Sequence, residues 1–397
     1  MTLLVAVINV SDMSESAASV IIAGGGPAAV EASLALHDLA GFRVRLTLVA
    51  PDPDLVVRAY EVLAPFHERY ERRYSLARLA AEFDIELVRD ALAGVDPSAQ
   101  TLALRAGASR RYDALIVAVG GRPMGTLPGA IPFRGFKDTS RLKELLMSSQ
   151  AGRHPSVAFV VPSGHTWPLP LYELALHMST WLADRRVTGM PLTIVSPERE
   201  PLGLFGTAVS AEVAGLLASH RVGFVSGHAF RLDSGRLQLA AGRELDADLA
   251  IALPRLDGPH ISGLPHDADG YIPVDEFGRV PGVQHVFAAG DATSASIKQG
   301  GLATQQSDAI AELLAAEYGA PIQVSVNRPV LRAVLFGGRE RRYLYAELGD
   351  RLQETSRASV NPLWPESSKL LGRYLAPYLE KLDEAGSRPT APKGGLQ

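Results

Sequence analysis

A glycine-rich segment near the start of the chain constrains the fold more than any other feature. Residues 21–29 read IIAGGGPAA, an apolar run followed by three glycines and then by small helix-forming residues. This order predicts a tight turn from a strand into a helix, in which Gly24 permits the bend, Gly26 lets a ligand approach the backbone and Ala29 keeps the helix close. Because free amides at a helix start attract anions, the segment predicts a nucleotide-binding turn. A single turn of this kind also occurs where no ligand binds.

Two later segments strengthen that hypothesis. Residues 115–123 (LIVAVGGRP) form a second strand that ends in glycines, and residues 280–292 (VPGVQHVFAAGDA) form a third that runs into Gly290 and Asp291. In order and spacing, the three segments resemble the FAD-binding halves of the pyridine nucleotide-disulfide oxidoreductase family. The resemblance implies that the early glycines hold the pyrophosphate of FAD and that Asp291 bonds its ribityl or phosphate oxygens.

The resemblance also implies a set of FAD-binding residues along the chain. In the resembled family, an acidic residue at the end of the second strand is expected to bind a ribose hydroxyl. This sequence has Ala50 at that position and Asp52 just beyond it. Asp52 either binds the ribose or belongs to an ordinary turn. Arg58 lies where the chain runs beneath the flavin ring in that family, and its alternative is a solvated charge. The predicted FAD-binding residues are Gly24, Gly26, Pro27, Ala28, Ala29, Ala50, Asp52, Arg58, Ala91, Ala118, Val119, Gly120, Gly290, Asp291, Lys298, Gln299 and Gly300.

A helix is expected to begin near Gly300. In the resembled flavoproteins this helix start points at the pyrimidine edge of the flavin, where its amides and dipole stabilise negative charge at N1 and O2. Lys298 adds a full positive charge there and is a candidate catalytic residue. The alternative is a lysine that caps the helix at the surface.

Composition excludes several classes of function. The chain has no cysteine, so it cannot exchange disulfides or capture sulfide through a thiolate, although its pattern is similar to the scaffolds of sulfide:quinone reductase and type II NADH dehydrogenase. A net charge of -4, with charges interspersed, disfavours nucleic acid as a partner. The ten histidines lack metal-ligand spacing, so no metal is predicted. No apolar run is long enough to cross a membrane, and we expect a cytoplasmic protein.

The order of segments predicts an α/β protein with two Rossmann-like domains for FAD and NAD(P), the second inserted in the first, and a small C-terminal α+β domain. The expected division is listed in chain order: a loose extension over 1–19, an FAD-binding domain over 20–150 and 270–325, a second domain over 151–269, a C-terminal domain over 326–385 and a disordered tail over 386–397. Met13 is an alternative start of the chain.

The second domain keeps a strand, helix and strand pattern over residues 157–161, 171–184 and 192–196, where NAD(P)H binds in the resembled reductases. Its turn departs from theirs, because Trp167, Pro168 and Pro170 stand where close phosphate approach requires glycine. Glu173 matches a glutamate of nicotinamide-using relatives and is a candidate catalytic residue. Trp167 is another: it either shields the flavin, stacks on a flat substrate or plugs the core. Whether NAD(P)H binds stays open.

Near the C-terminus, apolar residues recur at helical spacing over residues 370–382, and Pro377 is expected to kink that helix. Three interpretations compete: packing on the chain's own core, the seam of a homodimer, or shallow contact with a membrane surface that gives access to a quinone.

These features predict an FAD-dependent oxidoreductase. It would pass hydride or electrons from a reduced small-molecule donor, with NAD(P)H as one candidate, through FAD to a quinone, a small electrophile or a carrier. The alternatives are a flavoprotein reduced by a non-nicotinamide donor and linked to quinones, or a flavin-bearing interaction or sensor protein without turnover.

Overall fold

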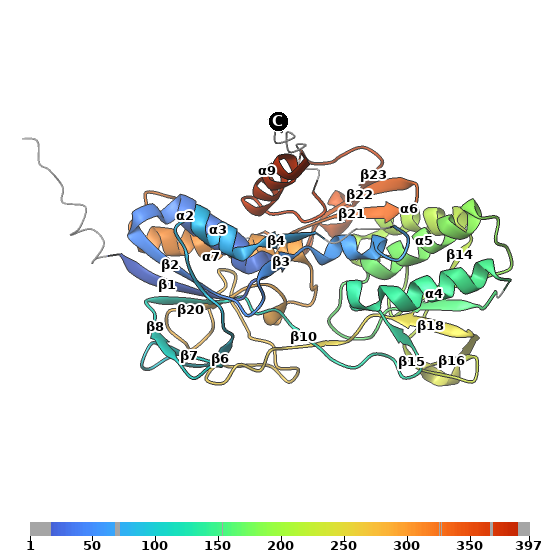
Figure 1. Ribbon diagram of the computed structural model, residues 1–397, viewed down its shortest axis with the longest axis horizontal. Coiled ribbons are helices and arrows are strands. Elements are labelled where there is room, and N and C mark those ends of the chain that lie inside the picture. Colours follow the sequence, from blue (N-terminus) through green and yellow to red (C-terminus); the bar gives the residue numbers. More distant parts are fainter. Residues whose placement is uncertain are drawn as a thin grey trace, which may run out of the picture.

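The computed structural model describes residues 17–67, 72–152, 154–324, 326, 328–365 and 368–387. The expected N-terminal extension with Met13 lies largely outside these residues, as does most of the expected tail. Two parallel five-stranded sheets lie at opposite ends of an elongated molecule, and the C-terminal segment packs along one side of both (Figure 1).

The first sheet contains the glycine-rich turn. Its strand order is β20-β9-β1-β2-β5, and all of its pairs are parallel. The strands are β1 (Ala18–Ala23), β2 (Val44–Val49), β5 (Glu86–Val88), β9 (Ala114–Val117) and β20 (Val286–Ala288). Helices α2 (Pro27–Ala40) and α7 (Gly300–Glu317) cover one face, where Val20 and Ile22 are buried. The other face buries Ile21 and Ala23 against a three-stranded meander, β6 (Leu92–Asp96), β7 (Thr101–Leu104) and β8 (Ser109–Arg111).

Three short elements connect strand β2 to the rest of this unit. They are β3 (Asp54–Val56), the 3-10 helix η2 (Arg58–Leu63) and β4 (Arg73–Ser75), which pairs with β3. The helix α3 (Leu76–Glu82) follows and leads into β5.

The second sheet has the order β11-β18-β12-β13-β14. Its strands are β11 (Ile131–Pro132), β12 (Val157–Val160), β13 (Leu192–Ser196), β14 (Val222–Ser226) and β18 (Leu249–Ala252). Helices α4 (Thr139–Gln150), α5 (Leu169–Asp184) and α6 (Thr207–Ser219) bury their apolar residues in one large core with this sheet. The antiparallel strands β15 (Ala229–Asp233), β16 (Arg236–Leu239) and β17 (Glu244–Asp246) contribute Leu237 and Leu239 to a smaller core beside β12 and β18. Strand β11 already belongs to this sheet although it precedes residue 151.

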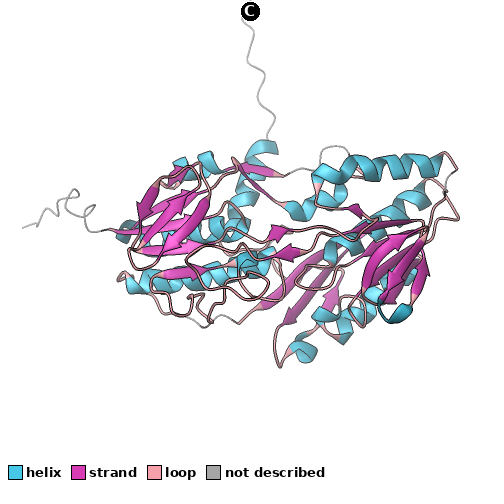
Figure 2. Ribbon diagram, turned by 90° about the horizontal axis from the view of Figure 1, so that it is seen from below, coloured by secondary structure: helices cyan, strands magenta, loops and turns pink. Residues whose placement is uncertain are grey.

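Two of the segments that connect the two units lie side by side. These segments pair with each other as the antiparallel strands β10 (Arg122–Pro123) and β19 (Leu256–Asp257). Figure 2 shows the two sheets at the two ends of the molecule from below.

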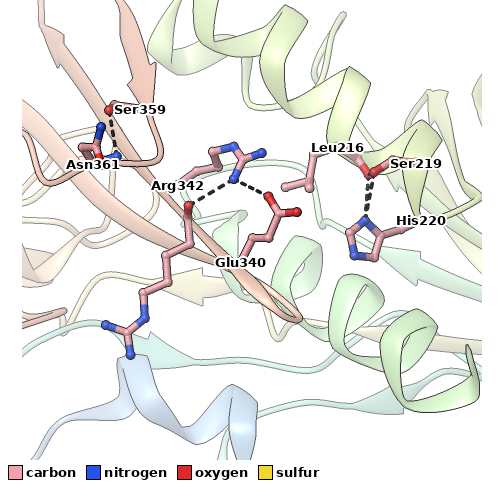
Figure 3. Close-up of polar contacts among 8 residues, drawn as sticks. Leu216, Ser219, His220, Glu340, Arg342, Ser359 and Asn361 are labelled. Carbon is pink, nitrogen blue, oxygen red and sulfur yellow. Dashed lines mark hydrogen bonds and ion pairs between the residues drawn. The ribbon is translucent and has the colours of Figure 1, made fainter. Parts of the chain in front are cut away.

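The C-terminal part is a small antiparallel sheet followed by a helix. Strands β21 (Val330–Gly337), β22 (Glu340–Glu347) and β23 (Arg357–Ser359) pair in sequence, with the helix α8 (Leu352–Thr355) between the last two. Figure 3 shows the turn of the hairpin, where Arg342 donates to Glu340 and to the carbonyl of Arg341, near His220 at the end of α6. Leu216 of α6 lies so close to Gly337 that a β-carbon there would be 3.2 Å from it. The sheet thus packs on the second unit.

The last helix corrects one prediction. Helix α9 spans Leu375–Ser387, so Pro377 lies in its first turn, where an amide has no partner within the helix and proline causes no kink. Leu375, Tyr378 and Leu379 are buried in the core formed by α2 and α7. The apolar stripe therefore packs on the chain's own core, as the first interpretation predicted. Within the described residues, no helix is both long and apolar enough to cross a membrane.

Candidate flavin site

The turn after β1 has the geometry that the glycines predicted. Gly24 adopts φ +136° and donates its amide to the carbonyl oxygen of Val49 at 2.8 Å. A β-carbon at Gly24 would lie 2.1 Å from the carbonyl oxygen of Ala118, so no side chain fits between β1 and the end of β9. Glycine is required here because two parallel strands and the turn meet at one point.

Gly26 differs from Gly24, because a β-carbon there would meet no atom within 4 Å. It is the N-cap of α2, has φ -88° and ψ -175°, and no side chain caps the helix start. The amides of Ala28 and Ala29 in the first turn therefore have no intrahelical acceptor, and the space next to Gly26 is open. Such a helix start binds a pyrophosphate, so this turn fits the anionic part of FAD.

The opposite wall of the site comes from the other strand ends. Gly290 lies against the first turns of α2 and α7, since a β-carbon there would be 3.3 Å from that of Ala28 and 3.2 Å from that of Ala303. Asp291 follows it, and burial raises the pKa of its carboxyl while Lys298 and Arg58 lower it. The structure therefore brings the predicted residues Gly290, Asp291 and Arg58 together.

The remaining predicted residues occupy different positions around this wall. Val119 and Gly120 are partly exposed after β9, and Ala91 is partly buried before the meander. Ala50 is fully buried and donates its amide to the carbonyl of Val88 at 3.0 Å, whereas Asp52 is exposed two residues later. Position 50 is thus enclosed by its neighbours, and Asp52 is the first carboxylate along the chain after β2.

The start of α7 is partly satisfied by the chain itself. Gln299, predicted to bind the cofactor, accepts from the amide of Leu302 at 2.8 Å and donates to the carbonyl of Arg332 at 3.0 Å. This cap orients the helix start while Gly300 and Gly301, its first two residues, carry no side chain. The amides of these glycines fit the role predicted for the helix, which is to face the pyrimidine edge of a flavin.

Lys298 is buried, which excludes the surface-cap alternative. It is 4% exposed, and its Nζ donates to the carbonyl of Thr293 at 2.5 Å and lies 3.6 Å from the centre of the Tyr271 ring. Burial lowers the pKa of Lys298 to about 8, although Asp291 and Asp267 act in the opposite direction. A lysine with this pKa is charged at neutral pH and neutral in mild alkali.

We expect the substitution Lys298→Met to lower the midpoint potential of bound FAD by about 30–60 mV, since 30 mV corresponds to about 1.4 kcal/mol for a two-electron couple. The reason is the loss of a positive charge near the reduced flavin. Because the ammonium deprotonates through a pKa of about 8, the difference from the unmodified protein should shrink above that pH. Spectroelectrochemical titration measures both effects, with the exposed Lys143→Met as control. Equal potentials at neutral pH would show that Lys298 only orders its loop.

The altered turn of the second unit contacts the segment that leads into α7. Thr166 forms a parallel bridge with Ile297, and the His165 ring lies 4.8 Å from that of Tyr271, the residue beneath Lys298. Pro168 is the N-cap of α5 and Pro170 its second residue, so this helix start lacks amides that an anion needs. Trp167 packs 6.0 Å from the Phe205 ring, within the apolar core of the second unit. That contact supports the interpretation of Trp167 as a core plug.

The carboxylate of Glu173 is buried and forms hydrogen bonds within the protein. Glu173 is 1% exposed, and its carboxylate accepts from Lys369 Nζ at 2.6 and 2.5 Å and from the amide of Phe336 at 2.8 Å. Lys369 also donates to the carbonyl of Ala59 at 2.8 Å, and its own amide donates to Tyr60 Oη at 3.0 Å. Glu173 thus joins α5, β21 and η2 through one buried cation.

Sequence reasoning missed Lys369, Tyr271 and Glu198. Lys369 and Tyr271 are distant in sequence from the residues that they contact, and no local pattern marks them. Glu198 follows β13, the position from which an acidic side chain reaches a ribose in a nucleotide-binding fold. Here it accepts from Tyr172 Oη and Ser196 Oγ, both at 2.9 Å, and burial raises the pKa of its carboxyl. Its position after a strand was the signal that could have found it.

A cavity of about 360 Å³ adjoins the site. Gly290, Asp291, Ile297 and Gln299 form one part of its lining. The rest of the lining combines apolar and polar side chains, among them Val274, Asp275, Glu276, Leu302, Gln306, Pro329 and Leu348. The cavity therefore lies at the α7 start, and its lining includes three of the residues predicted to bind FAD: Gly290, Asp291 and Gln299.

Comparison with known proteins gives a family match and several relatives. The family model described as pyridine nucleotide-disulphide oxidoreductase matches residues 18–307. Among curated proteins, the chain is similar to the sulfide-quinone reductase of Aquifex aeolicus, with 23% identity over 300 residues that cover 69% of this chain and 68% of the relative.

Solved structures agree on the fold. The sulfide:quinone oxidoreductase of Aquifex aeolicus superposes with a TM-score of 0.76 at 18% identity and covers 93% of this chain and 90% of its own. A ferredoxin reductase from Rhodopseudomonas palustris has a TM-score of 0.63 at 17% identity and covers 83% and 82%. At these identities the likeness shows the fold alone.

Proposed function

The chain belongs to the pyridine nucleotide-disulfide oxidoreductase family and is a flavin-dependent oxidoreductase, and on this premise we propose that it passes electrons from a donor other than a nicotinamide, through FAD, to a quinone. FAD supplies the redox chemistry when it is bound, because its ring accepts and releases two electrons. The protein binds FAD, tunes its potential and controls which molecules reach it.

The proposal that the donor is not a nicotinamide rests on the altered turn of residues 162–170. Thr166 bridges to Ile297 at the α7 entry, and the two prolines remove amides from the start of α5. A nicotinamide dinucleotide that binds at such a turn needs open space for its pyrophosphate and free backbone amides that donate to it. The absence of cysteine also excludes the thiolate route by which sulfide would be captured.

The cavity of about 360 Å³ supports a quinone as the acceptor. Its apolar residues Ile297, Leu302 and Pro329 suit a flat, uncharged ring, whereas Asp275 and Glu276 disfavour an anion. Gln306 accepts from the amide of Gly290 at 2.7 Å through Oε1, so its Nε2 is the end that can donate to a quinone carbonyl. The fold likeness to a sulfide:quinone oxidoreductase supports the same class of acceptor.

A second candidate is an NAD(P)H-dependent reductase. The parallel unit β12, α5 and β13 is retained, and a β-carbon at Gly164 would meet no atom within 4 Å, so part of the turn is open. Ferredoxin reductases and an NAD-dependent persulfide reductase share the fold. This candidate requires that the loop of residues 162–170 move away from Ile297.

Anaerobic reduction distinguishes the two candidates. We expect excess NADH or NADPH to leave the flavin band at about 450 nm unchanged, whereas dithionite bleaches it, because the donor turn is obstructed. A soluble naphthoquinone added next should restore the band within seconds, and free FAD serves as the control. Rapid bleaching by either nicotinamide would overturn the proposal for the donor and favour the second candidate. Slow reoxidation by the quinone, no faster than that of free reduced FAD, would overturn the proposal for the acceptor.

A further inference from the structure

A second cavity, of about 230 Å³, lies between α7, β21 and the segment that precedes α9. Thr304, Gln305 and Asp308 of α7, Arg332 of β21 and Arg373 line it. We call it the Asp308 cavity. Two of these side chains are already satisfied: Thr304 Oγ1 donates to the carbonyl of Leu371 at 2.7 Å, and Gln305 bonds the backbone of Val330 through both ends of its amide, at 2.9 Å each.

Two of the residues that line the Asp308 cavity each have a buried polar atom without a hydrogen-bond partner among the described residues. These atoms are Oδ1 of Asp308, which accepts, and Nε of Arg332, which donates. No ion pair joins Arg332 to another described residue, whereas Arg373 pairs with Glu312 at 3.1 Å. Buried polar groups are rarely left unpaired, because the loss of hydration costs about 1–3 kcal/mol for each.

The protonation of Asp308 defines what the cavity can bind. Glu31 of α2 is fully buried, accepts from the amides of Tyr374 and Leu375 at 2.9 and 2.7 Å, and shares a hydrogen bond with Asp308. Burial and then the charge of Glu31 raise the pKa of Asp308 to about 9, with Arg373 acting against them and Glu312 with them. At neutral pH the shared proton lies between the two carboxyls. Oδ1 of Asp308 is then an uncharged acceptor, and Arg332 lines the same cavity.

We propose that the Asp308 cavity is a binding site for a small hydroxycarboxylate, whose carboxylate accepts from Arg332 and whose hydroxyl donates to Asp308. An unpaired guanidinium selects an anion, and an uncharged acceptor selects a ligand that carries a donor as well. A simple carboxylate satisfies only the first group, and a divalent anion would be repelled by the buried charge of Glu31.

Binding at this site would act on the C-terminal segment. Leu371 and Gly372 form part of the cavity lining, and the same stretch of chain carries Lys369, which holds Glu173 and η2. A ligand that bridges α7 and β21 would therefore stabilise residues 369–375 against local opening. The proposal is independent of the donor and acceptor of the flavin, because binding is measured without turnover.

Isothermal titration of the FAD-bound protein with sodium glycolate and with sodium acetate tests the proposal. Glycolate should bind at least about tenfold more tightly than acetate, because only glycolate carries a hydroxyl donor. Arg332→Met should abolish the binding of glycolate, and the exposed Arg351→Met should leave it unchanged. Hydrogen exchange of residues 369–375 should slow when glycolate is bound.

A pH series separates a ligand site from a structural role. Because Asp308 loses its proton through a pKa of about 9, glycolate affinity should fall at least about tenfold by about pH 10. Asp308→Asn keeps an uncharged acceptor and should retain affinity at that pH. Equal affinities for glycolate and acetate, or glycolate binding that survives Arg332→Met, would overturn the proposal.

Discussion

Gly26→Val is expected to produce a folded protein that has lost FAD. The backbone of Gly26 has φ -88°, which valine adopts without strain, and a β-carbon there meets no atom within 4 Å. The new side chain would occupy the space beside the amides of Ala28 and Ala29, where a pyrophosphate must lie. We expect the dissociation constant of FAD to rise at least about 100-fold, which corresponds to about 2.7 kcal/mol.

The measurement is a titration of the apoprotein with FAD, followed by flavin fluorescence, together with a thermal melt of each apoprotein. Gly125→Val is the matched control, because Gly125 is exposed and a β-carbon there also meets nothing within 4 Å. The control should bind FAD normally. If Gly26→Val bound FAD with unchanged affinity while melting at the same temperature, the phosphate site would have to lie elsewhere.

Gly24 gives the complementary result. A valine there would place its β-carbon 2.1 Å from the carbonyl oxygen of Ala118 at φ +136°, so we expect misfolding rather than selective loss of FAD. Soluble expression and circular dichroism measure this outcome. The two glycines of one motif therefore serve different purposes, one in packing and one in ligand access, and the pair of variants distinguishes them.

The first Rossmann-like unit could be predicted from sequence because its signals are local. An apolar strand, a glycine turn and a helix start lie within ten residues, and their geometry follows from the backbone alone. Residues 192–196 were predicted as a strand for the same reason and form β13. The prediction about Pro377 was wrong because the apolar stripe begins at Leu370, before the helix does: periodicity marks a buried face but does not show where hydrogen bonding starts.

The side chains that join distant segments were harder to predict. The chain has only six lysines, and among those in the described residues two are buried, Lys298 and Lys369. Lys298 was identified because it lies beside a motif. Lys369 was not, because its partner Glu173 is 196 residues away. A lysine in an apolar C-terminal segment indicates a buried ion pair, because a buried lysine requires a partner. The partner itself cannot be identified from the sequence.

Lys369→Met is expected to destabilise the protein by about 3–5 kcal/mol, because it leaves the carboxylate of Glu173 buried without its cation. Denaturant unfolding measures the change. Lys381→Met removes the same kind of contact at the surface, where Lys381 Nζ lies 2.8 Å from Glu82 and is 68% exposed, and should cost less than about 1 kcal/mol. Equal effects of the two substitutions would show that the buried pair has no special importance for stability.

The double variant Glu173→Gln with Lys369→Met tests the cause of that loss. If the uncompensated charge is responsible, the uncharged amide should recover most of the stability, and the two substitutions should be strongly non-additive. The pH dependence has a defined sign. Burial raises the pKa of Glu173, so without Lys369 the folded state takes up a proton more readily than the unfolded state. The single variant Lys369→Met should therefore regain stability as the pH falls and lose it again as the pH rises, whereas the double variant should show no such slope.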